Sequence, residues 1–185
     1  MSLRKINLLV LLLGLAALAL VPAAFADTQK EAAPADKAEF IPTADELLSL
    51  NLINDERAKH DLAPLEFDPL LAQVAREHSA DMAKRAYFDH IEPAPARRSP
   101  MDRYAEALGR TPRVIVGENI ARCSQPLMGY IHLQLTDSET HLSNILDKAY
   151  ARVGVGIYSA PDGQVWLTQM YCGKKAETRR RTSEG

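Results

Sequence analysis

Few side chains in this 185-residue chain are of the types that usually carry out chemistry; it has five histidines and two cysteines. It contains no Gly-x-Ser-x-Gly elbow, no His-Glu-x-x-His, no phosphate-binding P-loop and no EF-hand loop. These absences exclude the hydrolase, protease, nucleotide and calcium sites that such motifs build. Ser138 lies three residues before His141, but no neighbouring residue marks it as an activated nucleophile. Cys123 and Cys172 lack the Cys-x-x-Cys spacing of zinc ribbons and redox motifs.

Three of the histidines are predicted to serve no chemistry. His78 lies within an apolar stripe of helical spacing, which favours a hydrogen-bonded core histidine over a ligand. His132 flanks another apolar helical face and is predicted to be solvated. His60 ends a predicted helix, where a cation interacts favourably with the helix dipole. The other two, His90 and His141, are far apart in the sequence, so spacing alone does not assign them to one site.

The chain begins with the layout of a secretory signal peptide. A short basic start is followed by the aliphatic run Leu8–Leu20 and by Ala24-Phe25-Ala26, an Ala-x-Ala cleavage site before Asp27. The run is shorter than the roughly 20 residues of a membrane span, although an uncleaved anchor is the alternative. No second apolar stretch of spanning length follows. Residues 1–26 are therefore predicted to be removed, which leaves a secreted or periplasmic protein with no transmembrane segment.

Composition indicates one ordinary globular domain after this signal. Lys and Arg number 22 against 24 Asp and Glu, a balance that excludes a strongly basic nucleic-acid binder. Residues 27–40 are predicted to be a flexible leader, 41–173 a single, monomeric domain, and 174–185 a basic disordered tail. In an oxidising compartment the two cysteines either form a disulfide or remain as two free thiols.

Helix and strand signals divide the domain into two parts. Helices are predicted from Thr43 to about His60, from Pro69 to about Arg85, from Pro100 to Leu108, and after Pro126. Strands are predicted at 114–120, 153–158 and 165–171, with a hairpin turn at Asp162-Gly163. Helices first and a terminal hairpin favour an α+β domain with an antiparallel sheet. Gly154 and Gly156 are expected to let another element approach that sheet closely.

Several short segments, in order and spacing, resemble the CAP superfamily of cysteine-rich secretory proteins, antigen 5 and plant pathogenesis-related proteins. They are Leu52-Ile53-Asn54-x-x-Arg57, Ala75-x-x-His78-x-x-Asp81-Met82-Ala83, Tyr87-Phe88-x-His90, Gly117-Glu118-Asn119-Ile120, His141-x-x-Asn144-Ile145-Leu146, Val153-Gly154-Val155-Gly156 and Thr168-Gln169-Met170-Tyr171. The chain is most similar to the short secreted bacterial branch with an SCP domain. The resemblance covers roughly Leu47 to Cys172.

This resemblance implies an α-β-α sandwich, in which a central antiparallel sheet lies between helical layers. It also implies a cleft lined by two histidines and two acidic residues. His90, Glu118 and His141 match three of these positions. The fourth position departs from the bacterial pattern, and Glu139 there either supplies the missing carboxylate or is simply exposed.

Three interpretations of this cleft remain open. Imidazoles and carboxylates suit a divalent metal ion such as zinc, with His90, Glu118, His141 and Glu139 as ligands. The first three of these residues could instead perform acid–base catalysis in a hydrolase, or form a buried hydrogen-bonded network. The first hypothesis is an exported, non-enzymatic binding protein for a metal ion, a lipid or a wall component. The alternatives are a hydrolase and an interaction module with a vestigial cleft.

Overall fold

The computed structural model describes residues 40–124 and 127–174. The predicted signal peptide, nearly all of the predicted leader and the basic tail beyond Lys174 lie outside the described residues. Phe40, the last residue of that leader, packs its ring against Phe67 and against the guanidinium of Arg76. The packed part of the described chain therefore begins one residue before the predicted boundary.

Five helices and four strands make up the described residues. In chain order they are α1 (Ala44–Lys59), β1 (Glu66–Phe67), α2 (Pro69–Arg85), α3 (Pro100–Leu108), β2 (Val114–Cys123), α4 (Met128–Thr136), α5 (Glu139–Leu146), β3 (Tyr150–Ser159) and β4 (Val165–Lys174). The four predicted helices and three predicted strands are present, whereas sequence patterns do not predict β1 and α5. No helix in this part of the chain is long and apolar enough to cross a membrane.

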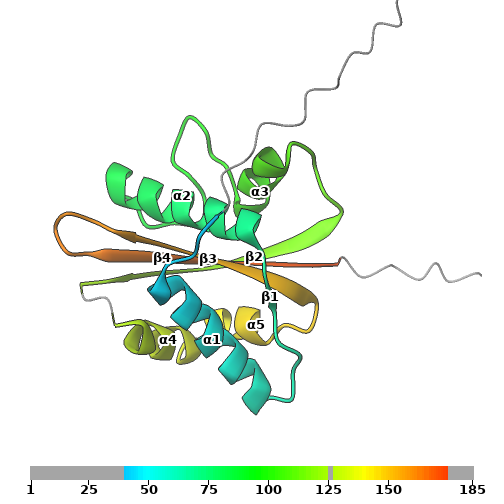
Figure 1. Ribbon diagram of the computed structural model, residues 1–185. Helices are drawn as coiled ribbons and strands as arrows, with labels where there is room; N and C mark the ends of the chain where they lie inside the picture. The colour runs from blue at the N-terminus through cyan, green and yellow to red at the C-terminus, as the bar shows by residue number, and fades with distance from the viewer. Residues whose placement is uncertain (1–39, 125–126, 175–185) are drawn as a thin grey trace, which may run out of the picture. The chain divides into compact units, whose positions relative to one another are not determined.

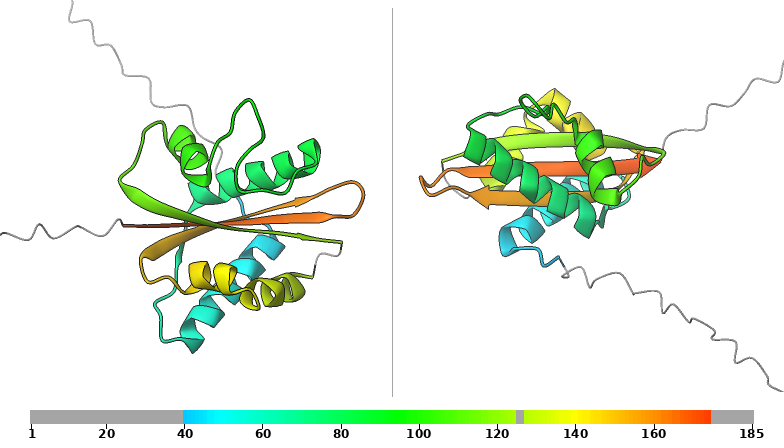
Figure 2. Two further views of the ribbon diagram at one scale, coloured as in Figure 1. Left: turned by 180° about the vertical axis from the view of Figure 1, so that it is seen from behind. Right: turned by 90° about the horizontal axis from the view of Figure 1, so that it is seen from above.

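The strands form one sheet in the order β1-β3-β4-β2 (Figure 1). β4 pairs antiparallel with both β2 and β3, in agreement with the predicted antiparallel sheet, and the two-residue β1 pairs with β3 in parallel. Helices α2 and α3 cover one face of the sheet, and α1, α4 and α5 cover the other, as the reversed view in Figure 2 also shows. This is the predicted α-β-α sandwich, and β2 lies at its edge.

Local sequence signals explain where three of the helices begin. Thr43 and Glu46 form a reciprocal capping box at the start of α1, and Ser99 and Asp102 form another at α3. At α2, the Asp68 side chain accepts from two backbone N–H groups of the first turn. These side chains satisfy donors that a helix leaves free at its N-terminus.

Each face of the sheet has its own core. The α1, α4 and α5 face packs around Ile53, Ile145 and Tyr171, all fully buried. The α2 and α3 face packs around Leu71 and Met170. Each strand therefore contributes to two apolar layers, which fits the near-continuous burial of β4.

Glycines in β3 allow α2 to lie directly on the sheet, as expected. A β-carbon on Gly154 would meet the backbone nitrogen of Ala72 at 2.1 Å, and one on Gly156 would meet that of Arg76 at 1.9 Å. Only a residue without a side chain permits this approach. The close contact fixes α2, and with it the loop that leaves its C-terminus.

The two cysteines are free thiols, which is the second of the two alternatives that the sequence leaves open. Cys123 lies opposite Val165 and Cys172 lies opposite Val116 in the β2–β4 register. The cysteines are thus at opposite ends of this strand pair. Since a strand rises about 3.3 Å per residue, they are much farther apart than the roughly 6 Å between α-carbons that a disulfide spans.

The close contact between α2 and β3 predicts that one added methyl group at Gly156 lowers the stability of the fold strongly. Gly156→Ala should lower the free energy of unfolding by at least about 2 kcal/mol, because its β-carbon has only backbone atoms to displace. In Gly129→Ala, within α4, the new β-carbon meets nothing within 4 Å, and stability should rise slightly, by up to about 1 kcal/mol. Urea unfolding of both variants measures the difference. Equal stabilities would contradict the packing of α2 on β3.

Candidate functional site

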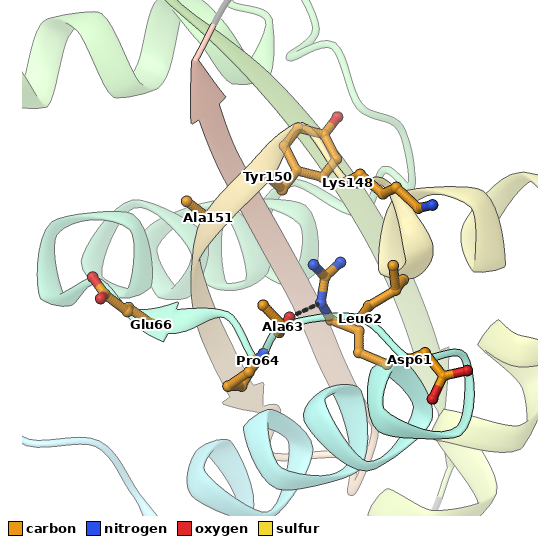
Figure 3. A pocket seen from close by; sticks show the side chains of 9 residues that line it. Asp61, Leu62, Ala63, Pro64, Glu66, Lys148, Tyr150 and Ala151 are labelled. Carbon is orange, nitrogen blue, oxygen red and sulfur yellow. Dashed lines mark hydrogen bonds between the residues drawn. The ribbon is translucent and has the colours of Figure 1, made fainter.

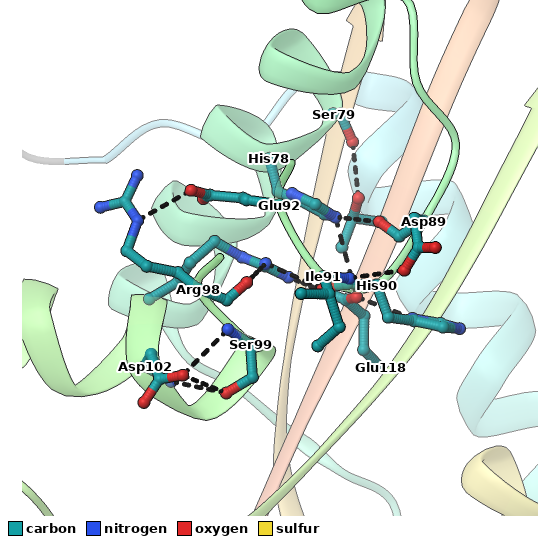
Figure 4. A network of polar contacts seen from close by, with 12 residues as sticks. His78, Ser79, Asp89, His90, Ile91, Glu92, Arg98, Ser99, Asp102 and Glu118 are labelled. Atoms are coloured by element: carbon teal, nitrogen blue, oxygen red, sulfur yellow. Dashed lines mark hydrogen bonds and ion pairs between the residues drawn. The ribbon is translucent and has the colours of Figure 1, made fainter. Parts of the chain in front are cut away.

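The structure presents two polar regions that could bind a ligand. One is a pocket of about 470 Å³ between the α1–β1 connection and the start of β3 (Figure 3). None of the predicted site residues lines this pocket. The other is a network of ionisable side chains between α2, α3, the loop joining them and β2 (Figure 4). The second region contains His90 and Glu118, so it is the candidate site that the sequence indicates.

Glu118, in the middle of β2, is the centre of this network. Its side chain is 1% exposed, and both carboxylate oxygens have partners. Oε1 accepts from Nδ1 of His90 at 2.8 Å, and Oε2 accepts from Nη2 of Arg103 at 2.6 Å. A buried carboxylate is costly unless it is paired and hydrogen-bonded, and Arg103, itself 5% exposed at the side chain, supplies the opposite charge.

Arg103 also holds the loop that carries His90. Its Nη1 donates to the backbone carbonyls of His90 at 3.0 Å and of Arg98 at 3.1 Å. Farther along, Nε of Arg98 donates to the buried carboxylate of Glu92 at 2.9 Å. One arginine of α3 therefore neutralises the carboxylate of Glu118 and fixes the backbone on which His90 lies.

His90 is the exposed end of the network, with 46% of its side chain accessible. Because a carboxylate oxygen can only accept, Nδ1 of His90 carries the proton in this contact, which directs Nε2 away from Glu118. The hydrogen bond to Glu118 raises the pKa of His90. The pair stabilises the fold fully below the unfolded-state pKa near 6.5, and this contribution is lost as the pH rises through the raised folded-state pKa.

His78 is a core histidine, as predicted. Its side chain is fully buried, and Nε2 donates to the backbone carbonyl of Asp89 at 3.2 Å. Burial lowers the pKa of His78, which favours the neutral ring. Nε2 is also 3.8 Å from Oε1 of Glu118. His78 therefore ties α2 to the residue that precedes His90.

His141 comes from the opposite helical layer, on α5. The ring is partly buried and Nδ1 has no hydrogen-bond partner among the described residues. Burial lowers the pKa of His141, and a positive charge on His90 lowers it further. His90 and His141 come from helical layers on opposite faces of the sheet, and both lie beside β2, which is an edge strand.

A second set of hydrogen bonds holds α5 against β2. Nδ2 of Asn119 donates to the carbonyl of His141 at 3.1 Å. Nδ2 of Asn144 donates to the backbone carbonyl of Glu118 at 3.1 Å and to Oδ1 of Asn119 at 2.9 Å. A β-carbon at Gly117 would lie 2.1 Å from the hydroxyl of Tyr150. Each residue of Gly117-Glu118-Asn119 is therefore required for a different structural reason.

The four residues predicted as metal ligands do not form one ready ligand set. Glu139 is exposed at the start of α5, and both oxygens of Glu118 are occupied by protein donors. Within the described residues there is no group of three or more His, Cys, Asp or Glu side chains arranged to hold a metal ion. Of these four residues, His90 keeps Nε2 free of the contact with Glu118, whereas Nδ1 of His141 is buried and has no partner among the described residues.

Other predictions about polar residues failed where tertiary contacts decide. His132 is 9% exposed and its Nδ1 is buried without a partner among the described residues, so the predicted solvation is wrong. It is covered because α4 packs against α1. Sequence reasoning also missed Arg103. The available signal was that a buried Glu118 needs a cation, but composition does not say which one.

Comparison with known proteins identifies the family. The sequence model of the cysteine-rich secretory protein family, CAP, matches residues 50–171. The chain therefore belongs to this family. The match covers all five helices and the four strands in whole or in large part, and it includes His90, Glu118 and His141.

Similar proteins are found among bacteria. The chain is 36% identical over 125 residues to the Bacillus subtilis (strain 168) protein YkwD, across 68% of this chain and 46% of YkwD. An extracellular protein containing an SCP domain from Bacillus anthracis is 31% identical with a TM-score of 0.60, across 71% of this chain and 40% of that one. An outer surface protein from Borrelia burgdorferi has a TM-score of 0.63 at 18% identity, across 73% and 97% of the chains, and shows the fold alone. The match thus spans less than half the length of YkwD.

Removing the charge of Glu118 should be far more damaging than removing that of Glu139. Glu118→Gln leaves Arg103 buried without a counter-charge, and breaking such a pair costs about 3–5 kcal/mol. Glu139→Gln, at an exposed position, should change the free energy of unfolding by less than about 0.5 kcal/mol. Chemical unfolding at pH 7 measures both. If the two variants unfold at the same denaturant concentration, Glu118 is not the buried centre of the network.

Proposed function

We propose that this chain is an exported CAP-domain binding protein whose cleft takes a divalent metal ion such as zinc through His90 and His141. The observation that carries the proposal is the bond between Nδ1 of His90 and the buried carboxylate of Glu118. A carboxylate on the far nitrogen of a histidine fixes its tautomer and increases the basicity of the other nitrogen. Nε2 of His90 is thereby prepared to bind a metal ion.

The state of His141 supports the same proposal. A neutral imidazole is the form that binds a metal, and burial lowers the pKa of His141. Its Nδ1 is buried without a protein partner within the described residues, so Nε2 is the nitrogen that we assign to the ion. His90, whose pKa is raised, must lose its proton before it can bind the ion. A bound ion would supply Lewis acidity and coordination positions for a further ligand.

Glu118 has a different role here from the one that the family resemblance implies. Because Arg103 and His90 occupy its oxygens, we assign Glu118 to orienting His90 and not to coordinating the ion. Glu139 is left out because of its exposure. Two protein ligands make a weaker and more open site than the closed four-ligand sites of structural zinc.

A binding role is favoured over hydrolysis by the contacts of the two histidines. Within residues 40–124 and 127–174, neither ring of this pair is hydrogen-bonded to a serine, threonine or cysteine side chain, as an activated nucleophile requires. Export is supported by the signal-peptide pattern in residues 1–26 and by the similarity to an extracellular protein of Bacillus anthracis. A monomer outside the cytoplasm that acts by binding is thus the proposed state.

Zinc should raise the melting temperature of untagged protein, and the increase should depend on the two histidines. At a free zinc concentration a hundredfold above Kd, mass action stabilises the fold by about 2.7 kcal/mol. The double variant His90→Ala/His141→Ala should lose this response. His60→Ala, at the exposed end of α1, should keep it. The response should fade as the pH falls through the raised pKa of His90.

Glu118→Gln separates an orienting role from a coordinating one. If Glu118 acts through His90, zinc affinity should fall about 10- to 100-fold and remain measurable by calorimetry. A complete loss of binding in folded Glu118→Gln would make Glu118 a ligand. A zinc response that survives in the double histidine variant would place the metal elsewhere and overturn the proposal.

A further inference from the structure

The pocket in Figure 3 shares no lining residue with the polar network around Glu118. Its volume of about 470 Å³ lies within the range of small-molecule sites. Its charged lining residues are Arg57, Asp61, Glu66 and Lys148, and Tyr150 adds an aromatic wall. The pocket therefore offers two cations and two carboxylates to whatever enters it.

Arg57 is the buried charge of this pocket. The residue is 2% exposed, and three hydrogen bonds hold its guanidinium. Nε donates to the carbonyl of Ala63 at 2.8 Å, the contact drawn as a dashed line in Figure 3. Nη1 donates to the carbonyls of Ile145 at 2.8 Å and Asp147 at 3.0 Å. Arg57 is thus fixed between α1, the α1–β1 connection and the end of α5.

These contacts leave part of the guanidinium free. Within the described residues Nη2 of Arg57 has no hydrogen-bond partner, and it is not among the atoms sealed inside the protein. No carboxylate pairs with Arg57 in this part of the chain, whereas buried Arg103 is paired with Glu118. Burial also lowers the pKa of Arg57. A fixed cation with an unpaired N–H group beside a cavity favours a bound anion.

We propose that this pocket binds a small carboxylate ligand about the size of a dipeptide. Nη2 of Arg57 and the ammonium of Lys148 receive the carboxylate, since a guanidinium matches its geometry. The carboxylates of Asp61 and Glu66, both exposed, lie at opposite ends of the pocket (Figure 3), and one of them receives the ligand's amine. This site is independent of the metal proposed at His90 and His141.

The direct test is an NMR titration of the isotope-labelled protein with alanyl-alanine. The matched probe is alanyl-alanine amide, which lacks only the carboxylate charge. Up to about 10 mM, where a millimolar site would fill, the dipeptide should shift backbone amide signals of residues 57–66 and 148–151, and the amide should not. The proposal is overturned by no shifts, by equal shifts with both probes, or by shifts confined to other residues.

Matched lysine variants test the assignment of charges without disturbing the buried arginine. Lys148→Ala should weaken binding of alanyl-alanine about three- to tenfold, because it removes a charge from the pocket wall. Lys59→Ala removes an exposed lysine of α1 that does not line the pocket, and its affinity should equal that of the parent protein. Equal affinities of the two variants overturn the proposed carboxylate site.

Discussion

The burial of the Glu118 carboxylate is the constraint on which the candidate site depends. A carboxylate that is 1% exposed must find a cation and hydrogen-bond donors inside the protein. Arg103 on α3 provides the charge, and His90 on the preceding loop provides a ring N–H. Since Arg103 also binds the backbone of His90, the loop and the carboxylate are fixed together. The position of the exposed His90 ring thus follows from the need to pair the buried carboxylate of Glu118.

The position of β2 at the sheet edge extends this constraint to both helical layers. Successive strand residues point to opposite faces. The side chain of Glu118 therefore faces α2 and α3, whereas the side chain of Asn119 donates to the carbonyl of His141 on α5. In a central strand the two layers would be separated by the sheet. At the edge, residues of both layers contact neighbouring residues of β2: His90 through its ring and His141 through its backbone carbonyl.

Much of the fold could be predicted from local patterns, because local chemistry determines it. Capping boxes, prolines in the first helical turn and an Asp-Gly turn act over a few residues, and the corresponding helices and hairpin are present. The two-residue β1 was beyond prediction because it carries no periodicity. The free thiol of Cys123 and the burial of His132 have related causes: strand register decides pairing and helix packing decides burial, and neither can be read from neighbouring residues. Family resemblance identified His90, Glu118 and His141. Only the structure revealed that Arg103 pairs with the carboxylate of Glu118.

The most direct measurement is the protonation of the His90 ring, followed by nitrogen NMR across a pH titration. Our account predicts a neutral form with the proton on Nδ1, and a pKa above the ordinary value near 6.5. In folded Glu118→Gln the pKa of His90 should fall toward that ordinary value. A proton on Nε2 in the neutral form, or a His90 pKa that is the same in both proteins, would contradict the central role of Glu118.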